Sequence, residues 1–309
     1  MKIVFLDAET LGEDISLDKF DSFGEVIKYQ DTNPEETLIR VKNCDVVVTN
    51  KVEITKEIIE NSNFKLICVA ATGINNIDIE AAKQANIEVK NVSDYSTSSV
   101  AQMTFTLTLD LIHKLDYYKQ YVESLSWSNG KLFTNVDKPF FELKNKKWGI
   151  IGLGNIGKEV AKIAKAFGCE VNYYSTSGKN LDTNYKHLSL EELLKQSDII
   201  SIHSPLNKTT HNLLNKTNLN LLKKDCILVN VGRGGIINEK DLAEKLDSQK
   251  SLYCGLDVIE KEPIVKDNPL LKIKNKDRLV LTPHIAWSSI EARITLVDRI
   301  FDNIKKFVL

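Results

Sequence analysis

Short apolar runs alternate along the chain with segments whose apolar residues recur every three or four positions. In the first part, the runs that predict strands are KIVFLDA, GEVIKYQ, CDVVVTN, KLICVAAT and IEVKNV. The segments between them that predict helices are NPEETLIRVKN, TKEIIENS and IDIEAAKQAN. Such alternation is typical of a parallel sheet covered by helices on both faces. We therefore expect a small α/β unit that ends near Val92.

A second alternation begins at KKWGIIGLGNIG and continues through DIISIHSP, CILVNVGRGG, LYCGLDV and RLVLTPHIA. Between the two parts, one long helix is predicted from about Thr97 to Val122, after the cap-like run STSS. The irregular stretch SLSWSNGKLFTNVDKPFFELKN follows, and its aromatic side chains would need a surface to pack against. The last segment, SSIEARITLVDRIFDNIKKFVL, predicts a closing helix.

Composition restricts the class of protein. A length of 309 residues favours two domains, and 42% hydrophobic with 27% charged residues describes an ordinary globular protein. A net charge of −1 argues against nucleic-acid and anionic-membrane partners. No apolar run approaches the roughly 18 residues that span a bilayer. Because the N-terminus reaches Asp7 without a signal-peptide core, we expect a cytoplasmic protein.

The cysteines do not form a metal or redox pattern. They are odd in number, scattered and never spaced C-x-x-C, and no H-E-x-x-H occurs. We therefore expect buried free thiols and no metal site. The five positions are Cys44, Cys68, Cys169, Cys226 and Cys254.

A glycine motif carries the first functional signal. In KWGIIGLGNIGKEVAKIAKAFGCEVNYY a buried strand leads into Gly152, Gly154 and Gly157, a helix follows, and a second strand closes the unit. Gly152 permits a tight turn, Gly154 lets the backbone approach a pyrophosphate, and Gly157 lets helix and strand pack closely. The helix N-terminus offers free N–H groups to phosphates. This context predicts dinucleotide binding; glycines that serve only a turn are the alternative.

The loop VNYYSTSGKN lacks the acidic residue that usually holds the adenosine ribose of NAD. Ser175 occupies that position, 18 residues past Gly157. Its hydroxyl can bond a ribose hydroxyl, and Lys179 could reach a 2′-phosphate, but no arginine is present to grip one with two bonds. We expect both NAD and NADP to be used.

Three reactive residues follow predicted strands. Arg233 lies in VNVGRGG, in a chain with only five arginines, and its planar fork suits a carboxylate. Glu262 lies in DVIEKEPI and His284 in LTPHIAWSS. Each residue alone has a structural alternative. Arg233 could be a surface residue or form a structural pairing, Glu262 could be an exposed loop carboxylate, and His284 could be a hydrogen-bonded structural histidine. Together they follow strands of one predicted sheet, whose carboxyl ends form the mouth where ligands bind.

These motifs resemble the D-isomer-specific 2-hydroxyacid dehydrogenase family. GLGNIG is followed by VGRGG, by DVIEKEP with Glu262 29 residues past Arg233, and by TPHIAW 22 residues further on. The resemblance extends from VVVTNKVEIT and ATGINNID to WSSIEAR. It implies a Rossmann-type, doubly wound cofactor domain of residues 98–285. It also implies a smaller flavodoxin-like substrate domain of residues 1–97 and 286–309, an active site in the cleft between the domains, and a homodimer joined by the long helix and the irregular stretch.

The resemblance also implies roles for single residues. Arg233 would bind the substrate carboxylate and polarise the 2-keto oxygen, His284 would donate a proton to that oxygen, and Glu262 would hold the other ring nitrogen of His284. Backbone N–H groups of Gly73 and Ile74 would cradle the carboxylate. Asp257 would contact the nicotinamide amide, or would cap a helix or strand. The other matching cofactor positions are Thr104, Gly152, Gly154, Asn155, Ile156, Gly157, Ser175, Ser204, Pro205 and Val231.

The substrate is less constrained. Lys51 in TNKVEIT, together with Trp287, resembles the hydroxypyruvate reductase and glycerate dehydrogenase branch, so we expect reduction of hydroxypyruvate to D-glycerate and of glyoxylate to glycolate. A solvated Lys51 at a strand end is the alternative. Other activities within the family are D-lactate and D-3-phosphoglycerate dehydrogenase; the chain ends at Leu309 without the extension that many of the latter carry. A non-catalytic dinucleotide-sensing corepressor is disfavoured, because Arg233, Glu262 and His284 are all present.

Overall fold

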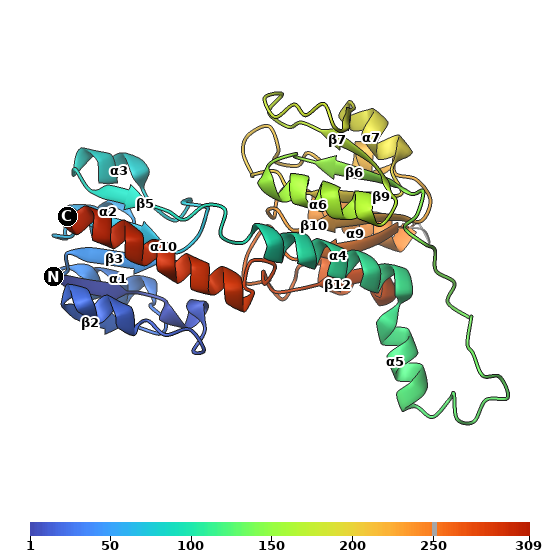
Figure 1. Ribbon diagram of the computed structural model, residues 1–309, viewed down its shortest axis with the longest axis horizontal. Coiled ribbons are helices and arrows are strands. Elements are labelled where there is room, and N and C mark those ends of the chain that lie inside the picture. The colour runs from blue at the N-terminus through green and yellow to red at the C-terminus, as the bar shows by residue number, and fades with distance from the viewer. Residues whose placement is uncertain (249–251) are drawn as a thin grey trace. The chain divides into compact units, whose positions relative to one another are not determined.

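The computed structural model describes residues 1–248 and 252–309 (Figure 1). The chain divides into two compact units, one of Met1–Ser96 with Ser288–Leu309 and one of Thr97–Trp287. The division predicted from the sequence lies at 97/98 and 285/286. The substrate-binding role of the first unit stays a prediction.

The first unit has a five-stranded, wholly parallel sheet in the order β2-β1-β3-β4-β5. Its central strands β3 and β4 are buried along their whole length, because helices cover both faces of a parallel sheet. The closing helix α10 lies against β4 and returns the C-terminal segment to this unit. The strands are β1 Lys2–Phe5, β2 Glu25–Lys28, β3 Val46–Thr49, β4 Leu66–Val69 and β5 Glu88–Lys90; the helices are η1 Ala8–Leu11, η2 Asp18–Phe23, α1 Pro34–Val41, α2 Lys56–Glu60, α3 Ile79–Gln84 and α10 Ile290–Val308.

The second unit has a seven-stranded parallel sheet in the order β12-β11-β10-β9-β6-β7-β8. The chain builds outward from β6 to β8 and then crosses to β9 on the other side of β6, so the strand order reverses between β6 and β9. This is the Rossmann-type, doubly wound arrangement that the sequence predicts. The strands are β6 Lys147–Ile151, β7 Glu170–Tyr174, β8 Lys186–His187, β9 Ile199–Ile202, β10 Cys226–Asn230, β11 Leu252–Leu256 and β12 Leu279–Leu281; the helices are α4 Thr97–His113, α5 Leu115–Glu123, α6 Asn155–Ala166, α7 Leu190–Gln196, α8 Lys216–Leu219, α9 Glu239–Ser248, η3 Pro269–Lys272 and η4 Lys276–Arg278.

Alternate residues of β10 divide the core of the second unit into two layers. Ile227 and Val229 pack in one apolar cluster with residues of α4 and α6. Cys226 and Leu228 pack in the other cluster with residues of α7 and α9. Because successive side chains of a strand point to opposite faces, the sheet is covered on both sides, and its loops remain at the two ends.

The single long helix predicted from Thr97 to Val122 is wrong. The helix ends as α4 at His113, and α5 starts at Leu115 after Lys114, whose φ of +51° is left-handed. The ammonium of Lys114 lies 4.1 Å from the ring centroid of Tyr253, which holds this residue against the unit. Helix α5 has no buried residue, and in Figure 1 it projects from the sheet together with the segment that follows it.

The cysteines are buried and unpaired, as predicted. Burial raises the pKa of the Cys44, Cys68 and Cys226 thiols to about 12. Within the ranges that the structure describes, no three metal-ligating side chains gather into a candidate site. In the same ranges, no helix combines the length and the apolar character that a membrane span requires.

A chain of polar side chains crosses the core of the second unit. Nε1 of Trp148 donates to Oγ of Ser201 at 2.9 Å, and the same hydroxyl lies 2.9 Å from Nε2 of His203. Burial lowers the pKa of His203 from 6.5 to about 3. The imidazole is therefore neutral in the folded protein near neutral pH.

We expect His203 to destabilise the cofactor-free protein as the pH falls. Because the folded pKa is lowered, the unfolded chain binds the proton first, so the penalty is absent above about pH 6.5 and grows toward pH 3. Between pH 7 and pH 5 the wild type should lose about 2 kcal/mol more unfolding free energy than His203→Asn. Urea unfolding at the two pH values measures this, with the exposed His187→Asn as control. Equal losses in wild type and His203→Asn would show that the ring is not held neutral.

Candidate active site

The glycine loop connects β6 to α6. Gly152 has a φ of +93°, and a Cβ there would lie 2.9 Å from the backbone nitrogen of Ser204. A Cβ on Gly157 would lie 2.3 Å from the carbonyl oxygen of Gly152, so only glycine lets the helix come this close. Gly154 precedes α6 and has no atom within 4 Å of its Cβ position. The loop therefore packs tightly against its neighbours at Gly152 and Gly157. At Gly154, beside the helix N-terminus, it leaves space for an approaching phosphate.

Unpartnered polar atoms surround this loop. In the described part of the chain, four buried side-chain polar atoms have no hydrogen-bond partner, and three of them are Oγ of Ser175, Nδ1 of His203 and Oγ of Ser204. Ser175 follows β7, and the other two follow β9, the strands on either side of β6. Buried polar groups normally have partners. Ribose hydroxyls and phosphate oxygens would supply them here, so the residues present fit a dinucleotide.

The loop after β10 presents Arg233. The side-chain amide of Asn230, which is 2% exposed, accepts from the N–H of Gly232 at 3.0 Å and donates to the carbonyl of Arg233 at 2.8 Å. A Cβ on Gly234 would lie 1.8 Å from the carbonyl oxygen of Ile259. The arginine loop therefore touches the backbone of the segment that follows β11, and glycine is required for this contact.

Glu262 and His284 form a direct pair. Nδ1 of His284 lies 2.6 Å from Oε2 of Glu262, and Oε1 of Glu262 accepts from the N–H of Ile259 at 3.1 Å. Both side chains keep partial access to solvent, 22% for the histidine and 30% for the glutamate. With Nδ1 engaged, Nε2 is the nitrogen left to meet an incoming oxygen. A histidine oriented in this way by a carboxylate can transfer a proton at Nε2.

The buried carboxylate of Asp257, 1% exposed, holds the loop of His284. Oδ1 accepts from Oγ1 of Thr282 at 2.6 Å and from the N–H of Ile285 at 2.9 Å, and Oδ2 accepts from the N–H of Ala286 at 2.8 Å. Burial raises the pKa of Asp257, and these hydrogen bonds oppose that shift. Asp257 thus positions the loop that carries His284, while its predicted contact with the nicotinamide amide stays a prediction.

The three loops belong to neighbouring strands. Arg233 follows β10, Glu262 follows β11 and His284 follows β12, and these strands pair in that order in parallel. Their side chains therefore share the carboxyl edge of the sheet with the glycine loop. A Cβ on Gly232 would lie 3.1 Å from the carbonyl oxygen of Ser204, so the arginine loop also contacts the loop after β9.

The remaining predicted cofactor residues lie in the same unit. Thr104 is buried in α4, and its hydroxyl donates to the carbonyl of Val100 at 2.8 Å. The carbonyl of Pro205 accepts from the hydroxyl of Thr210 at 2.7 Å. The first two residues of α6 and the buried residue directly after β10 complete the set: Asn155, Ile156 and Val231. Their contacts with a cofactor stay predictions.

The predicted substrate residues Lys51, Gly73 and Ile74 lie in the first unit. Lys51 follows β3, and Gly73 and Ile74 follow the paired strand β4, so all three lie at the same edge of that sheet. The carboxylate of Asp7, which follows β1, accepts from the N–H groups of Asn50 at 2.9 Å and Lys51 at 2.7 Å. Burial raises the pKa of Asp7, against the lowering by these hydrogen bonds.

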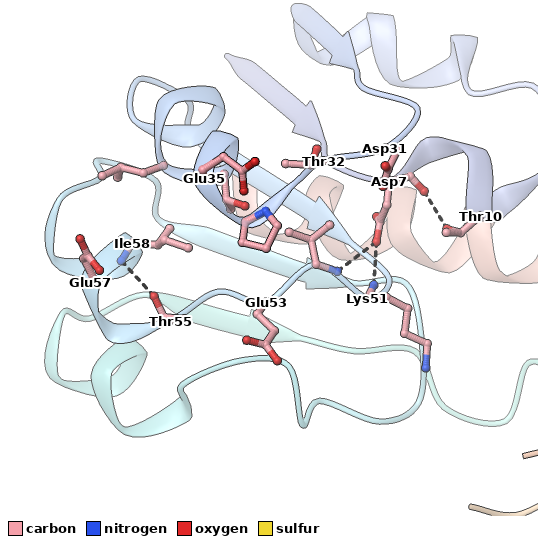
Figure 2. Close-up of a pocket in the computed structure, with 14 residues that line it drawn as sticks. Asp7, Thr10, Asp31, Thr32, Glu35, Lys51, Glu53, Thr55, Glu57 and Ile58 are labelled. Atoms are coloured by element: carbon pink, nitrogen blue, oxygen red, sulfur yellow. Dashed lines mark hydrogen bonds between the residues drawn. The ribbon is translucent and has the colours of Figure 1, made fainter. Parts of the chain in front are cut away.

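A hollow of about 640 Å³ opens beside Lys51 in the first unit. Figure 2 shows the carboxylate of Asp7 directed at the backbone of Lys51, and the Lys51 side chain directed away from Glu35 and Glu57. The predicted residues Gly73 and Ile74 are not part of its lining, which includes the acidic residues Asp7, Asp31, Glu35, Glu53 and Glu57. The hollow and the predicted carboxylate cradle are thus different surfaces of this unit.

Sequence reasoning missed Asp7 and Asn230, which hold two of these loops, and the buried His203 beside the glycine loop. Each stands at the end of an apolar strand of a parallel sheet or within two residues after it. A polar residue at the end of an apolar strand can hold a loop, and this signal is present in the sequence. The sequence does not show which segment the side chain contacts.

The chain is similar to known proteins over most of its length. Residues 105–286 match the sequence profile of the D-isomer specific 2-hydroxyacid dehydrogenase, NAD binding domain. The chain is 38% identical to a hydroxypyruvate reductase of Blautia hydrogenotrophica (100% of this chain, 97% of that protein). It is 34% identical to a glycerate dehydrogenase of Methylorubrum extorquens (99% and 96%). A solved structure of an acyclic imino acid reductase in complex with NADPH and D-Arg has a TM-score of 0.86 at 31% identity (100% and 97%).

The matched profile covers more than half of the chain, and it includes the glycine loop, Arg233, Glu262 and His284. The relatives extend the similarity over both units. The chain belongs to the D-isomer specific 2-hydroxyacid dehydrogenase family and is an oxidoreductase that acts on 2-hydroxy acids with a nicotinamide dinucleotide.

Proposed function

We propose that this protein reduces hydroxypyruvate to D-glycerate, and glyoxylate to glycolate, with NADH or NADPH. The observation that carries the proposal is the 2.6 Å contact between His284 and Glu262. They lie in the loops after β12 and β11, and β11 also pairs with β10, whose loop presents Arg233. Relatives named hydroxypyruvate reductase and glycerate dehydrogenase, which are similar over almost their whole length, support the choice of substrate.

The residues of the second unit divide the work of ketone reduction. When bound, the reduced nicotinamide supplies the hydride that the carbonyl carbon receives. Arg233 binds the substrate carboxylate with its planar fork and draws electron density from the 2-keto oxygen. His284 donates the proton from Nε2 to that oxygen, and Glu262 stabilises the imidazolium that carries it. In the oxidation direction His284 takes the proton back.

The dinucleotide would bind at the glycine loop and the adjacent strand ends. Backbone N–H groups at the start of α6 would meet its phosphates, and Ser175 would meet the adenosine ribose. The residues proposed to hold the remainder are Thr104, Asn155, Ile156, Ser204, Pro205, Val231 and Asp257.

The first unit would recognise the rest of the substrate. We propose that the N–H groups of Gly73 and Ile74 bind its carboxylate and that Lys51 meets the extra hydroxyl of hydroxypyruvate. A D-lactate or D-3-phosphoglycerate activity is the alternative, and a relative with the latter name is 35% identical over 57% of its own length. A corepressor without catalysis is a further alternative, which turnover of any 2-keto acid would exclude.

We expect hydroxypyruvate to be reduced with a higher kcat/KM than pyruvate, because an ammonium at Lys51 can bond the extra hydroxyl. Steady-state assays of hydroxypyruvate, glyoxylate, pyruvate and phosphohydroxypyruvate, each with NADH and NADPH, measure this. Lys51→Met should reduce the ratio of kcat/KM for hydroxypyruvate to that for pyruvate. Lys56→Met, a change to an exposed lysine in the same unit, should leave this ratio unaltered. Equal or better use of pyruvate by the wild type would count against the assignment.

We expect His284→Gln to lower kcat by about a hundredfold to ten-thousandfold, the usual contribution of general acid–base catalysis, while cofactor binding persists. Glu262→Gln should be milder. Because the imidazolium loses its carboxylate partner, the alkaline decline of ketone reduction should move to lower pH. Arg233→Lys should also be damaging, since a point charge cannot reproduce a two-bond grip.

The pH–rate profile provides the decisive measurement for Glu262. Glu260→Gln is the matched control, because it removes the same charge from the same segment without touching His284. If the alkaline limb of Glu262→Gln stayed where it is in the wild type, or if Glu260→Gln moved it equally, the pair would not work as proposed.

The cofactor choice rests on Ser175. Its Oγ is buried without a partner, and no carboxylate takes its place to repel a 2′-phosphate. The imino acid reductase at 31% identity was solved with NADPH, which supports use of the phosphorylated cofactor within this fold. We propose weak discrimination, with kcat/KM values for NADH and NADPH within roughly a hundredfold, about 2.7 kcal/mol.

Ser175→Asp should shift the preference toward NADH by more than about tenfold, because a carboxylate accepts from the ribose and repels a 2′-phosphate. Fluorescence titrations with both cofactors and the ratio of their kcat/KM values measure the shift. Ser177→Asp adds the same charge at an exposed position of the loop and should act much less. The placement of the ribose would be wrong if the wild type ignored NADPH or if Ser175→Asp left selectivity unchanged.

We further propose that the protein is a homodimer joined through α5 and the segment that follows it. No residue of α5 is buried. The segment after it exposes large apolar side chains, including Leu132, which is 73% exposed, and Phe133, which is 88% exposed. A second copy of the chain would cover them. Sedimentation of a monomer at micromolar concentration would contradict the proposal.

A further inference from the structure

The segment between β11 and η3, which carries Glu262, is held at two points by one side chain. Oε1 of Glu239 accepts from the N–H of Glu260 at 2.5 Å, and Oε2 accepts from Nδ2 of Asn268 at 2.7 Å. Asn268 is 4% exposed and caps η3 through the N–H of Leu270, so it is itself fixed. The two contacts lie on either side of Glu262.

Glu239 is well placed to act as this clamp. It is the first residue of α9, where a negative charge is favoured by the free N–H groups of the helix. The first turn of α9 is fixed by Asn238, whose side chain accepts from the N–H of Asp241 at 3.0 Å. The carboxylate of Glu239 is therefore presented from a rigid element and not from a loop.

A short chain of contacts leads from the clamp to the proton donor. Glu239 fixes the peptide between Ile259 and Glu260, against which Gly234 also packs. The N–H of Ile259 donates to Oε1 of Glu262, and Oε2 of Glu262 meets Nδ1 of His284. A displacement of this peptide would therefore move the carboxylate that orients the imidazole.

We propose that Glu239 is a positioning residue for the reduction: it holds the segment after β11 so that Glu262 remains against His284. The effect of Glu239 on catalysis rests on the proposed function. Its role in holding the segment rests on the contacts alone. Two other roles are possible for such a glutamate, an early-turn charge that stabilises α9 and a distant charge that favours the imidazolium. The experiment separates all three.

Glu239→Gln is the test variant, because its amide keeps the size of the side chain but cannot accept both N–H groups. We expect kcat for hydroxypyruvate to fall about tenfold with KM within about threefold, since a small misplacement of a catalytic pair lowers the chemical step. The alkaline limb should move in the direction of Glu262→Gln. In the cofactor-free protein, backbone amides of residues 257–268 should exchange hydrogen for deuterium faster.

Glu244→Gln removes the same charge from the exposed face of the same helix, where Glu244 pairs with Lys216 at 3.1 Å, and should change neither readout. The double variant Glu239→Gln/Glu262→Gln decides whether the effect passes through Glu262. If it does, Glu239→Gln slows the Glu262→Gln enzyme by less than about twofold.

A full tenfold loss in the Glu262→Gln background would overturn the proposal in favour of an independent charge or helix effect. Unchanged exchange and an unchanged kcat in Glu239→Gln would overturn it outright. A wild type that reduced no 2-keto acid would instead overturn the proposed function, and the exchange of residues 257–268 would still test the clamp.

Discussion

The position of the His284 loop depends on hydrogen bonds from its backbone N–H groups to the buried carboxylate of Asp257. The loop after β12 turns at His284, a left-handed residue whose N–H still donates to the carbonyl of Asp257, and the N–H groups that follow it leave the ladder of the sheet. Asp257 accepts from two of them, at Ile285 and Ala286, and the loop in return satisfies a carboxylate that burial would otherwise make costly. Each partner thus removes the other's unmet hydrogen-bonding need. The imidazole is presented at the sheet edge as a result.

Similar contacts hold the segments that follow other strands. Asn230 holds the arginine loop, Asp7 holds the loop of Lys51, and Glu239 holds the segment of Glu262. A parallel sheet gathers its loops at one edge but does not fix their conformation. Short polar side chains that accept backbone N–H groups supply that second constraint, because a charged or buried acceptor makes a stronger and more directional bond than water does.

How much of this could be predicted from the sequence depends on the range of the interaction. The strand–helix alternation and the turn at Gly152 are local, and both are confirmed. The break at Lys114 could not be predicted, since no glycine or proline marks it and the contact that accompanies it is with Tyr253, far along the chain. Asp7 was missed for the same reason: its carboxylate accepts from Lys51, 44 residues away. Motif resemblance paired Glu262 with His284, where spacing alone could not.

His284 has a φ of +56°, a backbone region that costs a residue with a side chain about 1 kcal/mol relative to glycine. The position where proton transfer is proposed is therefore also one where the fold alone would prefer another amino acid. Selection for thermal stability without selection for turnover would favour glycine here and discard the imidazole. A library screened only for resistance to heat would drift toward a robust dinucleotide-binding protein that no longer works as an enzyme.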